Sequence, residues 1–139
     1  MILLDSGFFF SIRVKSDSKH AIATKVLKET NWAGFRGIVT NNLVISETYT
    51  LVNMRTKSNP EIIGSLHSLF WGDDKFFQVI YHDDSESQDI ERILVKYSSP
   101  NRILSFVDAS LIYLAGKFDD VSIISSDAHF DGIIHRIKI

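Results

Sequence analysis

The sequence contains no cysteine, which excludes disulfides and thiolate-ligated zinc or iron–sulfur sites. It has no strong excess of either charge: the formal net charge of −2 gives no global basic surface for nucleic acid. Any contact with a polyanion must therefore come from a local patch. No apolar stretch is long enough to span a membrane, and the N-terminus lacks the features of a signal peptide. We therefore expect a cytoplasmic protein with no membrane segment.

The composition that is present is that of an ordinary globular domain. The 139 residues are 45% hydrophobic and 23% charged, and they include ten phenylalanines that can fill an interior. A chain of this length fits one hydrophobic core of normal size. We therefore expect a single domain over residues 1–139.

Short apolar segments alternate with segments of helical periodicity along the whole chain. Strands are expected at residues 2–5, 38–40, 76–82, 121–127 and 133–139, the last at a sheet edge. Helices are expected at residues 19–30, 41–57, 59–71, 85–98 and 105–118. Such alternation predicts an α/β fold with a mostly parallel sheet, whose ligand site lies at the carboxyl ends of the strands.

Two aspartates directly follow predicted strands. Asp5 ends the apolar run "MILLD", and Asp127 follows the run "VSIISS". Both are therefore expected at the edge of the sheet where a ligand would bind. The alternative is that each is a turn residue, since Ser, Asp and Gly commonly form turns without any further role.

Glu47 falls inside the apolar stripe of its predicted helix. Its neighbours one turn away are Leu43, Val44 and Leu51. A carboxylate on a buried stripe is costly unless it is paired, hydrogen-bonded or bound to a metal. The alternative is a glutamate at the edge of the stripe that reaches solvent or pairs with Arg55 on the same helix.

Asp108 also has apolar neighbours on its helix, and it has a second interpretation. The spacing of Ser105 and Asp108 matches a capping box at a helix start, where an acid is also favoured by the helix dipole. The two roles are compatible, because a capping carboxylate can also face a site. Near Asp127, His129 is either a ligand, a base or a structural residue, and Asp131 fits a turn.

Considered together, these acids indicate a cation site. An α/β sheet would bring strand ends and helix faces to one edge, and like-charged acids placed so closely would repel one another. Oxygen ligands suit hard cations such as Mg²⁺ or Mn²⁺. We therefore expect a divalent cation held by carboxylates.

Several α/β families place an aspartate after the first strand. Haloacid-dehalogenase-like phosphatases need a second aspartate where this chain has Gly7, and the order of residues in receiver domains is not matched. The chain instead resembles the PIN domain in four segments in the correct order, namely "ILLDSGFFFSI", "TNNLVISETYTLV", "ILSFVDASLIYLA" and "VSIISSDAHFDG". The order, spacing and size also resemble small VapC-type toxins of toxin–antitoxin pairs.

The resemblance implies a three-layer α/β/α fold and assigns roles by position. Asp5, Glu47 and Asp108 would be the core catalytic and metal-binding acids, with Asp127 as the fourth. Ser6 and Ser105 would be supporting polar residues, while Asp131 has no assigned role.

The activity implied is that of a Mg²⁺- or Mn²⁺-dependent ribonuclease, with RNA as substrate. The partners implied are an antitoxin and a second copy of the chain. The aromatic-rich segments "SGFFFSI" and "LHSLFWGDDKFF" would supply such contacts or pack in the core. Arg13, Lys15, Arg36 and Lys117 are candidate RNA contacts, each with the alternative of a solvated surface charge. Two other functions remain open, a non-catalytic PIN-like binding module and a nuclease of RNA processing.

Overall fold

The computed structural model describes all residues from 1 to 139 as a single sheet with six α-helices. The strands are β1 (Ile2–Leu4), β2 (Ile38–Asn41), β3 (Gln78–Ile80), β4 (Ser122–Ser125) and β5 (His135–Lys138). The helices are α1 (Ser6–Arg13), α2 (His20–Glu29), α3 (Asn42–Arg55), α4 (Pro60–Trp71), α5 (Asp84–Tyr97) and α6 (Phe106–Ala115). Two short 3₁₀ turns, η1 (Trp32–Gly34) and η2 (Ala128–Phe130), lie before β2 and after β4. None of the helices has the length and apolar character needed to cross a membrane.

The strands pair in the order β3-β2-β1-β4-β5, and every pairing is parallel. The first strand of the chain is therefore the central strand of the sheet. Leu4 at its carboxyl end pairs with Ile124 of β4, and β2 lies on its other side. The residues that follow β1 and β4 consequently emerge side by side at one edge of the sheet.

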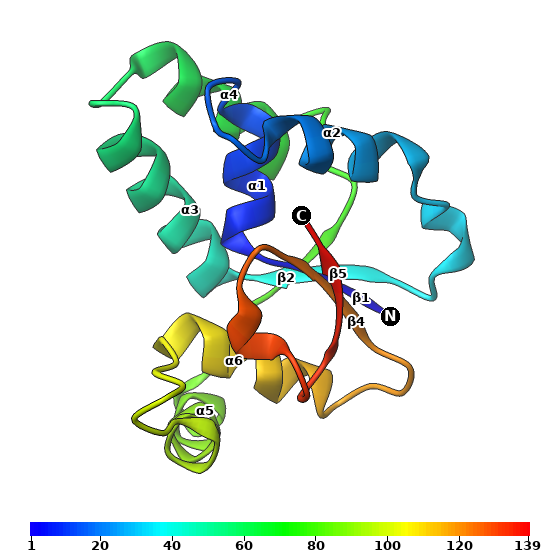
Figure 1. Ribbon diagram of the computed structural model, residues 1–139, viewed down its shortest axis with the longest axis vertical. Coiled ribbons are helices and arrows are strands. Elements are labelled where there is room, and N and C mark those ends of the chain that lie inside the picture. Colours follow the sequence, from blue (N-terminus) through cyan, green and yellow to red (C-terminus); the bar gives the residue numbers. More distant parts are fainter.

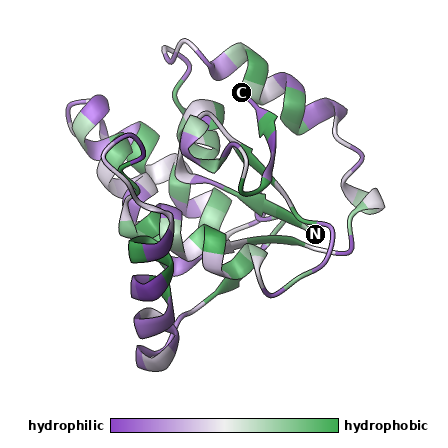
Figure 2. Cartoon of the chain, turned by 60° about the horizontal axis from the view of Figure 1, so that its bottom comes forward, coloured by the Kyte–Doolittle hydropathy of each residue, from purple (hydrophilic) through white to green (hydrophobic).

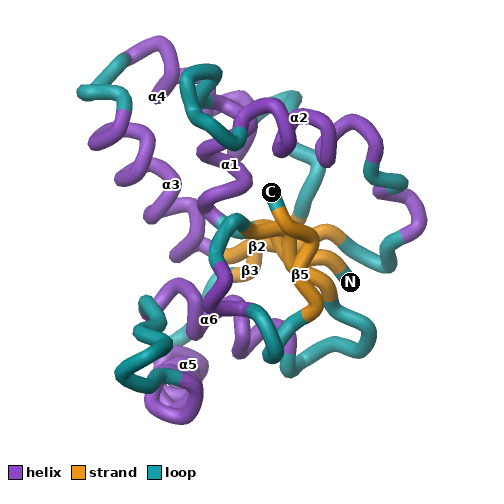
Figure 3. The backbone as a smooth tube through the Cα atoms, in the orientation of Figure 1, coloured by secondary structure: helices purple, strands orange, loops and turns teal.

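The helices form two groups, one on each side of the sheet (Figures 1 and 3). Helices α1 to α4 cover one face, where α1 packs against both α2 and α3, and α3 packs against α4. Helices α5 and α6 pack against each other on the opposite face. The expected three-layer α/β/α architecture with a parallel sheet is confirmed.

The core is apolar and rich in phenylalanine. All three residues of β1 are fully buried, as is expected of a central parallel strand covered on both faces. In Figure 2 the strands near the centre of the sheet are largely hydrophobic, whereas the helices alternate between hydrophobic and hydrophilic residues. The Phe9 ring packs 5.0 Å from Phe70 and 4.9 Å from Phe77, measured between centroids. Most of the two aromatic-rich segments therefore fills the core, although Trp71 is half exposed.

The elements agree with the sequence-based expectations except at two places. The helix expected at 19–30 is not the first one, because the chain already turns into α1 at Ser6. The Asp5 carboxylate accepts a hydrogen bond from the Ser6 N–H and caps that helix, which ends the strand at once. The strand expected at 76–82 is much shorter, since Phe76 and Phe77 pack into the core before β3 begins.

Candidate active site

Asp5 lies directly after the central strand and is almost completely buried, with 5% of its surface exposed. Its carboxylate accepts hydrogen bonds from the Ser125 hydroxyl at 2.6 Å and from the Ser6 N–H at 2.7 Å. Burial raises the pKa of Asp5 from its usual 3.8 to about 7; the Ser125 hydroxyl opposes this rise, and the charge of Asp108 adds to it. This carboxyl therefore keeps its proton to a higher pH than an exposed aspartate does.

Glu47 lies in the second turn of α3 and faces the same place. The Ser6 hydroxyl donates a hydrogen bond of 2.6 Å to its Oε2. Burial raises the pKa of Glu47, the Ser6 hydrogen bond opposes the rise, and the charges of Asp108 and Asp127 add to it. Glu47 makes no ion pair with Arg55, so the alternative of a pair within one helix is wrong.

Asp108 is both a helix cap and a member of this group. Its Oδ2 accepts from the Ser105 N–H at 2.8 Å, while the Ser105 hydroxyl accepts from the Asp108 N–H at 2.9 Å. This pair is the expected capping box of α6. Burial raises the pKa of Asp108, the Ser105 hydrogen bonds oppose the rise, and the charge of Asp127 adds to it. Only 8% of the residue is exposed, so the cap holds the carboxylate in a fixed position.

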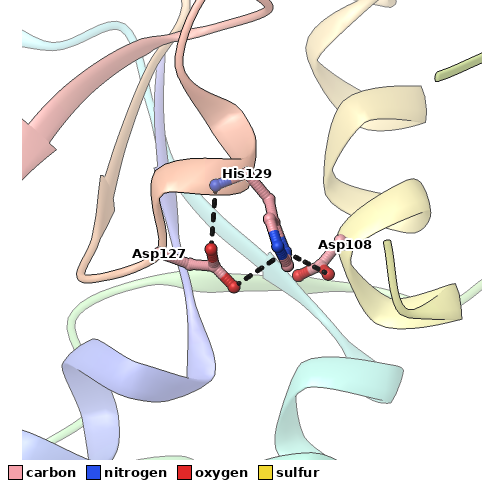
Figure 4. Close-up of side chains that lie close together, drawn as sticks. All are labelled: Asp108, Asp127 and His129. Carbon is pink, nitrogen blue, oxygen red and sulfur yellow. Dashed lines mark hydrogen bonds and ion pairs between the residues drawn. The ribbon is translucent and has the colours of Figure 1, made fainter. Parts of the chain in front are cut away.

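Asp127 and His129 come from the turn after β4. The Asp127 Oδ1 accepts from the His129 N–H at 2.8 Å, which starts the turn η2. Figure 4 shows the His129 ring between the carboxylates of Asp127 and Asp108. Its Nδ1 lies 3.2 Å from Asp127 Oδ2 and 3.7 Å from Asp108 Oδ2, and it has no hydrogen-bond partner. One ligand atom from each of these three residues lies within 4.8 Å of the others, a spacing suited to a metal ion.

Asp5, Glu47, Asp108 and Asp127 thus form one group, here named the acid cluster. Their closeness is visible in the electrostatics, since Asp108 raises the pKa values of Asp5 and Glu47 and Asp127 raises those of Glu47 and Asp108. No lysine or arginine forms an ion pair with any of the four. Clustered carboxylates without a cationic partner are suited to bind a divalent cation.

Two contacts that build this site are not indicated by the sequence, namely that of Ser125 with Asp5 and that of Asn41 with Ser110. Ser125 is fully buried and donates to Asp5, but in sequence "SSD" is typical of a turn. Asn41 caps α3 by accepting from the Val44 N–H, and its amide donates to the Ser110 hydroxyl of α6 at 2.8 Å. This link fixes the helix of Glu47 relative to the helix of Asp108.

Asp131 lies outside the acid cluster and has a structural contact instead. Both of its carboxylate oxygens accept from Arg136 of β5, at 2.7 and 2.8 Å. The side chain of Arg136 is 8% exposed and also donates to the carbonyl of Ser125 at 3.4 Å. Arg102 donates to the Asp131 carbonyl at 3.0 Å. These contacts hold the turn that carries Asp127.

The four cations suggested as RNA contacts are scattered, and their role stays a prediction. Arg13 pairs with Asp74 at 2.7 Å, and Lys117 pairs with Glu86. Lys15 and Arg36 are exposed, but Arg36 lies just before β2 and thus at the edge of the sheet opposite the acid cluster.

Solved structures of similar fold are known from bacteria and archaea. The VapC20 toxin of Mycobacterium tuberculosis, described as cleaving the sarcin–ricin loop, has a TM-score of 0.79 at 20% identity, and the match covers 100% of both chains. FitAcB of Neisseria gonorrhoeae has a TM-score of 0.65 at 13% identity over 99% of this chain and 97% of that one. PAE2754 of Pyrobaculum aerophilum has a TM-score of 0.58 at 16% identity over 97% and 87%.

No curated protein matches the sequence significantly. The family model of the PIN domain, however, matches residues 2–134 and so includes all four members of the acid cluster. This match agrees with the parallel sheet, with its central first strand, and with the resemblance found in the four sequence segments. The chain belongs to the PIN-domain family.

Proposed function

We propose that this protein is a divalent-metal-dependent endoribonuclease, the toxin of a VapC-type toxin–antitoxin pair. The observation that carries the proposal is the acid cluster, four carboxylates without a cationic side chain at the carboxyl edge of a PIN-domain sheet. The whole-length likeness to the VapC20 toxin supports the choice of RNA as substrate.

The residues present fit a bound Mg²⁺ or Mn²⁺. The donors are carboxylate oxygens, three of the four carboxyls have raised pKa values, and the orphaned Nδ1 of His129 points between two of them. Asp5, Glu47, Asp108 and Asp127 would hold the ion. When bound, it supplies an activated water and stabilises charge that develops on the phosphate during in-line displacement.

The rest of the site positions these ligands. The Ser125 and Ser6 hydroxyls donate to Asp5 and Glu47 and so orient their carboxylates, as outer hydrogen bonds do in metal sites. Ser105 fixes Asp108 through the capping box. Because a metal-activated water can be the nucleophile, the chain need not supply one of its own, and hydrolysis by water is the reaction that these groups support.

The expected partners follow from the same assignment. FitAB has been solved bound to a DNA fragment, and VapC20 is described as a toxin. We expect this chain to bind a cognate antitoxin and to act in the cytoplasm, and a homodimer is expected as well. Exposed apolar side chains such as Trp71, Met54 and Ile103 are available for such contacts.

The test is cleavage of a panel of RNAs by the purified protein with Mg²⁺, with Mn²⁺ or with a chelator. Wild type should cleave only with metal, and Asp5→Asn should abolish cleavage. Asp119→Asn is the matched control, because Asp119 is exposed and lies outside the cluster. Equal activity of wild type and Asp5→Asn, or no activity of folded wild type with metal, would contradict the proposal and favour a non-catalytic binding module. An adjacent gene for a small antitoxin would separate a toxin from a nuclease of RNA processing.

A further inference from the structure

A pocket of about 320 Å³ lies next to the acid cluster, between α1, α3 and the loop that joins α1 to α2. Gly7 and Ser126 form its wall on the side of the cluster. A Cβ on Gly7 would meet the Ser126 hydroxyl at 3.0 Å and the Asp5 Oδ2 at 3.7 Å. Gly7 and Ser126 therefore lie between the pocket and Asp5.

Helix α3 connects the acid cluster to the far end of the pocket. Glu47, Leu51 and Arg55 follow one another at intervals of four residues and so lie on one face of the helix. Leu51 and Arg55 line the pocket. With a rise of 1.5 Å per residue, Arg55 lies about 12 Å along the helix axis from Glu47. A strand that crosses the cluster would thus reach Arg55 within a few nucleotides.

The pocket carries two cations without a partner in the chain. Neither Arg55 nor Lys19 forms an ion pair. The carboxylate of Asp17 in the same pocket accepts from the Ser11 hydroxyl at 2.7 Å and from the Lys19 N–H at 3.3 Å. Asp17 thus shapes the loop that presents Lys19, and the two cations leave the lining with an excess positive charge.

The lining also has an apolar part, formed by Phe10 and Leu51. Proteins bind single-stranded RNA through these two features, with cations that contact its phosphates and aromatic or apolar surface that contacts unstacked bases. The volume lies at the lower end of the range for sites that enclose one small molecule. An acidic peptide would use the cations of this pocket but would not need its apolar wall.

We propose that this pocket binds one unpaired nucleotide of the RNA, next to the phosphate that is cut, with Arg55 and Lys19 as its phosphate contacts. The inference rests on the proposed ribonuclease function and adds to it a place for the flanking strand. To the four scattered cations predicted from sequence, whose role stays a prediction, it adds two that share a cavity beside the acids.

The test measures binding separately from cleavage. In an Asp108→Asn background with Mg²⁺, the affinity for a short, unstructured, fluorescein-labelled RNA is measured by anisotropy at several salt concentrations. Loss of one phosphate contact should weaken binding about fivefold at about 0.1 M salt and reduce the salt slope by about 0.7. We expect this for Arg55→Gln and for Lys19→Gln, and a larger loss for Arg55→Glu.

The matched controls are Arg92→Gln and Lys25→Gln, exposed cations whose side chains lie outside the pocket. They should leave the affinity and the salt slope unchanged. Equal affinity of Arg55→Gln and Lys19→Gln with these controls would overturn the inference, as would equally effective competition by polyglutamate of matched charge. Either result would leave metal-dependent cleavage by wild type untouched, whereas failure of that cleavage would count against the proposed function alone.

Discussion

Two groups of carboxylates in this protein differ in what surrounds them. In the acid cluster, burial raises the pKa values of Asp5, Glu47 and Asp108, and the acids raise those of one another. The Nδ1 of His129 lies between Asp108 and Asp127, while Arg136 lies near Asp127 without forming an ion pair with it. The hydrogen bonds from Ser125 and Ser6 only partly offset the rise in the pKa values of Asp5 and Glu47.

Five acids elsewhere have cationic partners, namely Glu29, Asp74, Glu86, Asp89 and Asp131. Lys117 beside Glu86 lowers the pKa of that carboxyl to about 2, and the Arg136 guanidinium lowers the pKa of Asp131. These pairs link α5 to the end of α6 and hold the turn after β4. These two acids are satisfied within the chain, whereas no lysine or arginine pairs with the acid cluster, as expected if a cation from outside the chain completes it.

The largest effect expected from this contrast is on catalysis. Asp108→Asn keeps an oxygen that can accept the capping hydrogen bond but removes one negative ligand. Metal-dependent RNA cleavage should fall more than about 100-fold. Losing a residue that only hydrogen-bonds to a metal ligand costs about 10- to 100-fold, and losing a ligand itself should cost more. Ser105→Ala removes only the hydroxyl half of the capping box and should cost about 1 kcal/mol of stability. Cleavage rates and thermal unfolding of both variants check this, and an active Asp108→Asn enzyme would show that Asp108 is only a cap.

The next effect concerns the serine that supports Asp5. Ser125→Ala removes the hydroxyl that donates to Asp5 and favours its charged form. We expect Mn²⁺ affinity, measured by isothermal titration calorimetry, to fall about 10- to 100-fold. Ser122→Ala on the same strand is the control, because its hydroxyl contacts His135 and not the cluster. Identical Mn²⁺ affinities of Ser125→Ala and Ser122→Ala would show that Ser125 does not support the metal site.

The third effect is a pH-dependent gain in stability of the metal-free Asp5→Asn variant over wild type. Because the pKa of Asp5 rises from 3.8 to about 7, the folded state binds more protons than the unfolded state between these values, and the stability of the metal-free protein falls as pH rises through them. As an upper bound, this rise in pKa corresponds to a loss of about 4 kcal/mol in the free energy of unfolding when Asp5 is ionised. Asp5→Asn should therefore stabilise the metal-free protein by about 2 kcal/mol at pH 7.5, and by much less at pH 4.5. Urea unfolding at both pH values measures this, and a loss of stability at pH 7.5 would mean that Asp5 is satisfied within the chain.

The smallest effect is expected for a paired acid. Glu86→Gln removes the partner of Lys117, and that ion pair is partly exposed. It should slightly lower the melting temperature and leave metal-dependent cleavage unchanged. In wild type, the pKa of Glu86 in the folded state, about 2, lies below the ordinary value. The contribution of Glu86 to stability is therefore lost as pH falls towards 2. A marked loss of cleavage in Glu86→Gln would contradict the view that this paired acid has only a structural role.

The sequence predicts the sheet and the four acids because both follow local rules. Uninterrupted apolar runs indicate parallel strands, and acids at strand ends or on apolar stripes stand out as costly. Helix α1 was not predicted, since its phenylalanines show no polar alternation and its cap is the same Asp5 that marks the site.

The contacts that could not be predicted from the sequence join residues that are far apart along the chain. Ser125 contacts Asp5 from 120 positions away, and nothing in a serine pair indicates such a partner. Arg55 was considered as a partner for Glu47, but eight residues along a helix is about 12 Å, too far for an ion pair. Only the fold shows that it lines the pocket beside the cluster instead.

The central claim, that the acid cluster is completed by a divalent cation, is tested most directly by titrating the protein with Mn²⁺. Calorimetry should show saturable binding to wild type and to Asp119→Asn, with metal-dependent stabilisation against heat. Binding should be lost in Asp5→Asn and in Asp108→Asn, although both remain folded. Saturable binding that is equal in all four proteins, or none in wild type, would contradict the account.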